Sequence, residues 1–212
     1  MNKTVVFDLD DTLFYEIEYL KSAFKYIAHK VNATNYHSLY AKMIDLYHQK
    51  KDVFLYIENN STFSKKDLIV LYRNHLPNIQ PIDGALNVLK DFSVEYNTGL
   101  ITDGYSITQR NKLKSLSFES YFKDIIISEE FGSDKSCEKN FGYFHKYNSK
   151  NYYYIGDNTS KDFLLPNKLG WTTICLRDKG YNIHKQNFSL SNEYQPKYII
   201  DELIEVIQIV EY

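Results

Sequence analysis

Short apolar runs alternate with longer segments of helical spacing along most of the chain. Six apolar runs have the length and composition of β-strands, and the last of them is the weakest. They lie at residues 4–8, 98–102, 124–128, 152–156, 172–176 and 198–200. Segments with apolar positions on one helical face lie between most of them, at 86–92, 106–116, 159–169 and 201–210. This alternation predicts an α/β fold with a doubly wound, mostly parallel, Rossmann-like sheet. Pro166 is expected to bend or shorten the helix at 159–169.

Residues 15–79 break the alternation, because they contain no convincing strand and predict three or four helices. The apolar positions on these helices are 17, 20, 24 and 27, then 39, 43, 46 and 47, and finally 68, 71 and 72. Ser64 is the expected N-cap of the last helix. We therefore expect a helical cap domain at 15–79, inserted into a core domain made of 1–14 and 80–212. The alternative is a helical bundle that belongs to the core itself.

Composition narrows the class of protein. A chain of 212 residues with 43% hydrophobic residues can form one core and a modest insertion. Its net charge of −2 gives no electrostatic reason to bind nucleic acid, and no apolar stretch is long enough to predict a membrane span. The chain starts with an expected strand rather than a leader, and Cys137 and Cys175 read as free thiols. A soluble, cytoplasmic protein is expected, and nothing in the sequence favours one oligomeric state.

Two carboxylates, Asp8 and Asp10, directly follow the first predicted strand. Open α/β sheets place their ligands at the carboxyl ends of strands. Like charges this close repel unless a cation, a shared proton or solvent compensates them. A Mg²⁺ ion bound by carboxylates, with one carboxylate acting as a nucleophile, would satisfy this need. The alternative is an acidic N-cap for the following helix.

Polar residues also follow two other predicted strands. Thr102 and Gly104 offer a hydroxyl and backbone N–H groups that could bind a phosphoryl group, and Asp103 between them is expected to turn its side chain away. Asp157 follows the fourth strand directly, with Asp162 five residues later. The alternatives are an ordinary strand-to-helix turn at 102–104 and a helix cap at Asp157.

Together these motifs resemble those of the haloacid-dehalogenase-like phosphohydrolases. Asp8, Asp10 and Thr12 are similar to the first motif of that family, Asp-x-Asp-x-Thr. The resemblance implies that Asp8 attacks phosphorus and that Asp10 acts as general acid and base, with Thr12 in a supporting position. It assigns Asp157 to Mg²⁺ together with Asp8 and Asp10. It also implies that Asp162 orients a metal-bound water or a lysine.

The family also carries a lysine that keeps the nucleophile ionised and binds a phosphate oxygen. Here the segment Glu129-Glu130-Phe131-Gly132 leads to Lys135, which is our choice for this lysine. Ser136 departs from the family pattern, in which proline is frequent, and Lys139 remains the alternative.

The resemblance implies Mg²⁺-dependent hydrolysis of a small phosphorylated metabolite, a sugar phosphate or a nucleoside monophosphate, through an aspartyl-phosphate. A phosphomutase of the same family and a non-catalytic phosphate-binding module are the alternatives; a dehalogenase would lack Asp10. The cap helices show no pattern that identifies the substrate. The Lys and Arg residues of 110–114 are expected to form a solvated helix face, and the histidines show no metal-ligand spacing.

Overall fold

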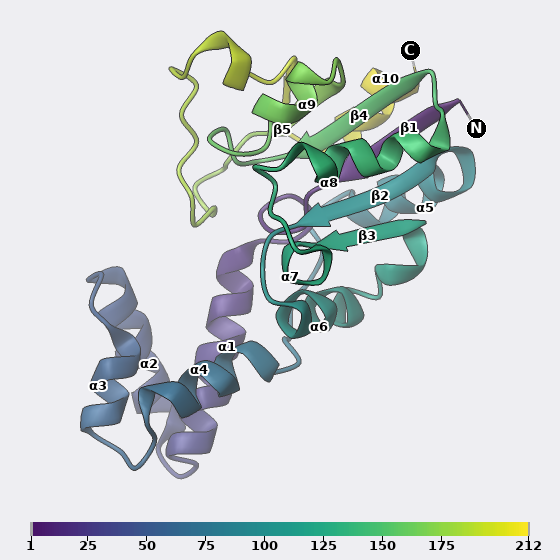
Figure 1. The fold of residues 1–212 in the computed structure, drawn as a ribbon. Helices are drawn as coiled ribbons and strands as arrows, with labels where there is room; N and C mark the ends of the chain where they lie inside the picture. Colours follow the sequence, from purple (N-terminus) through teal and green to yellow (C-terminus); the bar gives the residue numbers. More distant parts are fainter. Residues whose placement is uncertain (1, 212) are drawn as a thin grey trace.

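A computed structural model describes residues 2–211, and its centre is a parallel β-sheet (Figure 1). Within these residues the sheet has six strands in the order β3-β2-β1-β4-β5-β6. The strands are β1 (Lys3–Phe7), β2 (Asn97–Thr102), β3 (Asp124–Ile127), β4 (Asn151–Gly156), β5 (Thr172–Leu176) and β6 (Tyr198–Ile200). Every predicted strand is present with its ends within one residue of expectation, so the doubly wound parallel sheet is confirmed.

The register brings the carboxyl ends of the central strands to one edge of the sheet. Phe7 of β1 pairs with Leu100 of β2 on one side and with Ile155 of β4 on the other. The N–H group of Asp8 continues the ladder by donating to the carbonyl oxygen of Ile155 at 2.8 Å. The residues that follow β1, β2 and β4 therefore emerge side by side.

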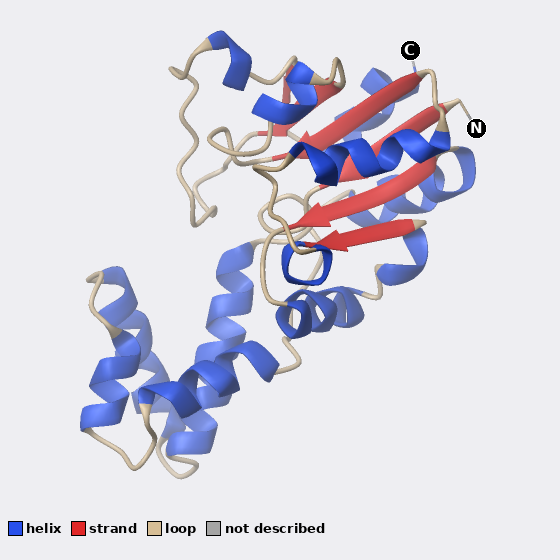
Figure 2. Cartoon of the chain, in the orientation of Figure 1, coloured by secondary structure: helices blue, strands red, loops and turns tan. Residues whose placement is uncertain are grey.

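Helices cover both faces of the sheet (Figure 2). Alternate residues of β1 point to opposite faces, with Val5 and Phe7 in one apolar cluster and Val6 in the other. The first cluster includes residues of α5 (Ala85–Glu95), α6 (Ser106–Leu116) and α10 (Val206–Glu211). The second lies under α8 (Glu138–Gly142) and α9 (Leu164–Lys168). The short helix α7 (Ser128–Phe131) follows β3 directly.

Residues 15–79 form four helices with an apolar cluster of their own. They are α1 (Glu16–Val31), α2 (Tyr36–His48), α3 (Val53–Asn59) and α4 (Lys65–Asn74). Their cluster is centred on Phe24, Ile27, Met43 and Leu68, and it shares no fully buried residue with the two clusters of the sheet. Figure 1 shows these helices grouped apart from the sheet, with α4 nearest α6.

Ser64 caps α4 as predicted. Its hydroxyl accepts a hydrogen bond from the N–H of Asp67 at 3.2 Å, and the Asp67 carboxylate accepts one from the N–H of Ser64 at 3.1 Å. This reciprocal arrangement satisfies two N–H groups that the first helical turn leaves without partners.

Two predicted helices differ from those observed. The helix expected at 159–169 is reduced to α9, because Asp162 accepts hydrogen bonds from the N–H groups of Asp157 and Asn158 and holds the preceding residues in a turn. The helix expected at 201–210 begins as a 3₁₀ turn, Leu203–Glu205, and continues as α10. Within residues 2–211, no helix combines the length and the apolar character needed to cross a lipid bilayer.

Gly99 in β2 leaves space for an aromatic ring. A Cβ atom at this position would lie 2.1 Å from Cε1 of Phe144, which is itself fully buried. The close approach of the ring to the backbone of β2 therefore requires a residue without a side chain.

We expect Gly99→Ala to lower the free energy of unfolding by about 1–3 kcal/mol, because an added methyl group overpacks the core. Urea unfolding measures this change. Gly142→Ala is the matched control, because among residues 2–211 no heavy atom outside its own helix and chain neighbours lies within 4 Å of the added Cβ, and its φ of −58° suits alanine. Equal effects of the two substitutions would contradict the packing argument.

Candidate active site

A cavity of about 180 Å³ lies where the carboxyl ends of β1, β2 and β4 meet. Seven of the predicted site residues line it: Asp8, Asp10, Thr102, Asp103, Lys135, Asp157 and Asp162. The cavity is also lined by five residues that the sequence did not predict to belong to the site: Asp11, Glu16, Asn158, Lys161 and His184. The parallel sheet thus brings together side chains from distant parts of the chain.

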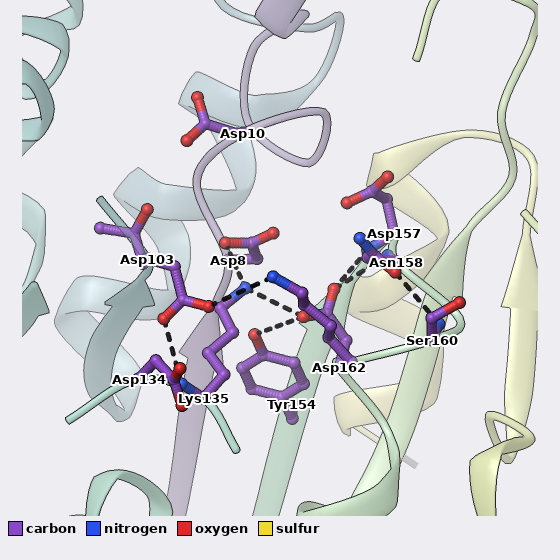
Figure 3. Close-up of polar contacts among 12 residues, drawn as sticks. Asp8, Asp10, Asp103, Asp134, Lys135, Tyr154, Asp157, Asn158, Ser160 and Asp162 are labelled. Carbon is purple, nitrogen blue, oxygen red and sulfur yellow. Dashed lines mark hydrogen bonds and ion pairs between the residues drawn. The ribbon is translucent and has the colours of Figure 1, made fainter. Parts of the chain in front are cut away.

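Lys135 lies between two buried carboxylates (Figure 3). Its Nζ atom is 2.6 Å from Oδ1 of Asp8 and 2.9 Å from Oδ1 of Asp162. Lys135 and Asp8 are each only 5% exposed, and Asp162 is fully buried. Burial lowers the pKa of Lys135, but the charges of Asp162 and Asp8 raise it, and its pKa is well above the ordinary value. Lys135 is therefore cationic, whereas Lys139 is exposed on α8.

Burial raises the pKa values of Asp8 and Asp157 well above the usual range, although the charge of Lys135 opposes the effect at both residues. Carboxylate oxygens of Asp8, Asp157 and Asp162 lie within 4.8 Å of one another. One lysine cannot offset three carboxylates at this distance, so the group is suited to a further cation.

The donors around this group fit Mg²⁺, which prefers oxygen ligands. Asp162 is already engaged, because its two oxygens accept from Lys135 and from the N–H groups of Asp157 and Asn158. Asp8 and Asp157 are thus the carboxylates of the group best placed to hold a metal ion. Asn182 donates from its side-chain amide to Oδ2 of Asp157 at 2.7 Å, which fixes the orientation of that carboxylate.

Gly156 makes the turn after β4 possible. A Cβ atom on Gly156 would lie 2.4 Å from Oδ2 of Asp162, the same oxygen that binds the N–H groups of residues 157 and 158. The Gly-Asp pair and the second Asp five residues later are therefore parts of one hydrogen-bonded unit.

Thr102 and Asp103 line the cavity, but Gly104 and Thr12 do not. The Thr102 hydroxyl accepts a hydrogen bond from the side-chain amide of Gln109. The Asp103 carboxylate binds the N–H group of Lys135 at 3.0 Å, so it supports the loop that carries the lysine. The N–H of Gly104 donates to the Ser128 hydroxyl at 2.9 Å, and the buried hydroxyl of Thr12 has no hydrogen-bond partner among residues 2–211.

Asp10 faces α6. Its contact with this helix corrects the prediction that the Lys and Arg residues of 110–114 form a solvated face. Oδ1 of Asp10 is 2.6 Å from Nζ of Lys112, and its Oδ2 accepts from the amide of Gln109 at 2.8 Å. Lys112 is 3% exposed and does not belong to a solvated face, although Lys114 on the same helix is exposed as expected. A signal was present in the sequence, because position 112 shares a helical face with the apolar positions 113 and 116.

The loop after β5, residues 177–197, also contributes to the site and was not predicted to do so. Besides Asn182, it brings Gln186, whose side-chain amide donates to the carbonyl oxygen of Asp157 at 2.8 Å. Its Ile183 N–H donates to Asp11 at 3.0 Å. The unusual length of this loop, which contains only a single 3₁₀ turn, was the available signal.

Asp11 connects this loop to the start of the helical insertion. It has a left-handed backbone with φ of 56°, and its other carboxylate oxygen accepts from the N–H of Glu16 at 2.7 Å. Burial raises the pKa of Asp11 to about 6 and that of Glu16 to about 7. The segment between β1 and α1 is therefore held by Asp11, which contacts both Glu16 and the loop after β5.

Comparisons with known proteins find relatives that align over almost the whole chain. The chain is 24% identical to the glyceraldehyde 3-phosphate phosphatase of Methanocaldococcus jannaschii, over 99% of this chain and 97% of that protein. It is also 24% identical to the protein of the same name from Pyrococcus furiosus, over 99% and 93% of the two chains. A magnesium-bound crystal structure of the Bacillus subtilis HAD-hydrolase YfnB has a similar fold, with a TM-score of 0.68, 20% identity and 99% coverage of both chains.

A family profile described as haloacid dehalogenase-like hydrolase matches residues 5–176, which include every predicted site residue. The match extends from β1 through the helical insertion to the end of β5. Since it spans most of the chain, the resemblance suggested by the motifs is confirmed, and this protein belongs to the haloacid dehalogenase-like hydrolases.

Proposed function

We propose that this protein is a Mg²⁺-dependent phosphatase that hydrolyses a small phosphorylated metabolite, either a sugar phosphate or a nucleoside monophosphate. The observation that carries the proposal is the buried contact of Lys135 with Asp8, beside Asp157 and Thr102 in one cavity. Two relatives that align over almost the whole chain are named glyceraldehyde 3-phosphate phosphatases, which supports a phosphate ester as the substrate.

Each residue has a place in the proposed reaction. Asp8 attacks phosphorus and forms an aspartyl-phosphate, while the Lys135 ammonium and the Thr102 hydroxyl bind phosphoryl oxygens. Asp8, Asp157 and the backbone carbonyl of Asp10 would hold Mg²⁺. When bound, this ion supplies positive charge that neutralises and orients the phosphoryl group. Asp162 keeps Lys135 in position.

Asp10 serves both half-reactions in this proposal. Its carboxyl group first gives a proton to the leaving oxygen of the ester, and it then takes a proton from the water that attacks the aspartyl-phosphate. The cap domain, proposed as residues 15–79 over a core of 1–14 and 80–212, would select the leaving group and exclude bulk water.

The first test removes the nucleophile. Asp8→Asn is expected to lower phosphate release from any substrate by at least about 10³-fold, because an amide cannot form the aspartyl-phosphate. A panel of phosphorylated metabolites, assayed for released phosphate, measures the loss.

Asp91→Asn is the matched control, because Asp91 is exposed on α5, and it should retain full activity. Circular dichroism should show the same fold for both variants. Equal Mg²⁺-dependent activity in wild type and Asp8→Asn would remove Asp8 from the proposed role.

The second test follows the linkage between protons and metal. Because burial raises the pKa values of Asp8 and Asp157 in the folded state, the metal-free protein loses stability as the pH rises through these values. Mg²⁺ favours the charged carboxylates, so its binding releases protons and strengthens as the pH rises. Thermal unfolding should therefore show a larger gain in Tm from Mg²⁺ at about pH 8 than at about pH 5, closer to the ordinary pKa of a carboxyl group.

At a Mg²⁺ concentration about 100 times its Kd, the expected stabilisation is about 2.7 kcal/mol. Asp157→Asn should remove most of this gain, while Asp91→Asn should leave it intact. A gain that is unchanged between the two pH values, or that survives in Asp157→Asn, argues against the proposed metal site.

A further inference from the structure

We infer that Gln109 and Lys112 of α6 are positioning residues that hold the carboxylate of Asp10 in its working place. This inference rests on the proposed function, because it takes Asp10 as the general acid. The two α6 side chains contact different oxygens of Asp10, Lys112 at 2.6 Å from Oδ1 and Gln109 at 2.8 Å from Oδ2. A carboxylate held through both oxygens has little freedom to rotate.

The burial of Lys112 shows that its placement is specific. Its side chain is 3% exposed, and the side chain of Asp10 is 19% exposed. A buried ammonium is costly unless an opposite charge and further contacts compensate it. The Nζ atom of Lys112 also lies 4.6 Å from the centre of the Tyr19 ring and 5.6 Å from that of Phe14, which favours a cation at this point.

Gln109 connects Asp10 to the proposed phosphate-binding hydroxyl. Gln109 is 1% exposed, and its side-chain amide donates to Asp10 and to the hydroxyl of Thr102. A primary amide has two N–H bonds, so it can serve both acceptors at once. The amide therefore fixes the distance between the proton donor and a group that binds the phosphoryl oxygens.

Gly104 makes room for this amide. A Cβ atom on Gly104 would lie 3.2 Å from both Cγ and Cδ of Gln109, and the backbone φ of 146° also disfavours other residues. Since its N–H group is bound to Ser128, Gly104 contributes to the site through the space it leaves for Gln109.

Correct placement of Asp10 matters most for esters with poor leaving groups. An alkoxide must receive a proton as it departs, and a positioned general acid contributes about 10²–10⁴-fold to such a step. A p-nitrophenolate leaves as a stable anion and needs little help. Loss of positioning should therefore be selective for alkyl phosphates, whereas general damage to the fold lowers the rate with both kinds of ester.

The experiment compares Lys112→Met and Gln109→Leu with wild type on two esters. The alkyl ester is whichever of glyceraldehyde 3-phosphate, ribose 5-phosphate and uridine 5′-monophosphate the wild type hydrolyses fastest, and the aryl ester is p-nitrophenyl phosphate. The measured quantity is kcat/KM, which includes the steps up to departure of the leaving group and excludes hydrolysis of the aspartyl-phosphate. We expect kcat/KM to fall about 10²-fold for the alkyl ester. For the aryl ester the fall should be smaller by a factor of about ten or more.

Two controls identify the route of the effect. Lys114→Met removes an exposed lysine from the same helix and should leave kcat/KM unchanged for both esters. In the double variant Asp10→Asn with Lys112→Met, the second substitution should cost nothing further, because Lys112 acts through Asp10. Equal losses for both esters, or additive losses in the double variant, would overturn the inference.

The outcomes separate the inference from the proposed function. Wild-type levels of alkyl ester hydrolysis in Lys112→Met and Gln109→Leu would overturn only the positioning role. If the wild type releases phosphate from none of the four esters, the proposed function fails and the inference fails with it. If Lys112→Met does not fold by circular dichroism, Gln109→Leu decides the question by the same comparison of esters.

Discussion

The ammonium group of Lys135, held between the carboxylates of Asp8 and Asp162, is the contact on which the rest of the site depends. Two buried carboxylates this close would repel strongly without a cation between them. The surrounding structure supports this contact. The Asp103 carboxylate binds the backbone N–H of Lys135, and the turn after β4 positions Asp162. Gly156 has no side chain and so leaves space for the Asp162 carboxylate. Asp157 adds a third carboxylate, so the group keeps an excess of negative charge that Lys135 alone does not balance. This excess is the physical reason to expect Mg²⁺ there.

The sequence predicted the sheet and most of the cavity because both follow from strand ends. Once residues 4–8, 98–102 and 152–156 were identified as parallel strands, Asp8, Thr102 and Asp157 had to emerge at the same edge. Lys135 was chosen by resemblance alone, since the segment after β3 has no periodicity that distinguishes it from Lys139. The contacts with Asp8 and Asp162 distinguish the two lysines, and they depend on residues far away in the chain.

Lys112 and the loop after β5 were missed for related reasons. A lysine in a helix is normally solvated, whereas Lys112 is buried and paired with Asp10, which lies 102 residues away in the chain. Asn182 and Gln186 lie in a loop with no apolar pattern, so nothing local indicates that their amides reach Asp157. The helix at 159–169 was predicted too long because helical periodicity takes no account of the turn before it, in which the Asp162 side chain binds the N–H groups of Asp157 and Asn158.

The central place of β1 also has a consequence for how the chain assembles. Lys3 at its start pairs with Asn151, and Thr4 pairs with Asn97, so this strand waits for partners that are synthesised much later. Pairings of such long sequence separation form slowly, whereas the helical insertion is built from neighbouring segments. The strand that precedes Asp8 thus remains unpaired during synthesis, and its apolar Val-Val-Phe run is open to aggregation until its partners are made.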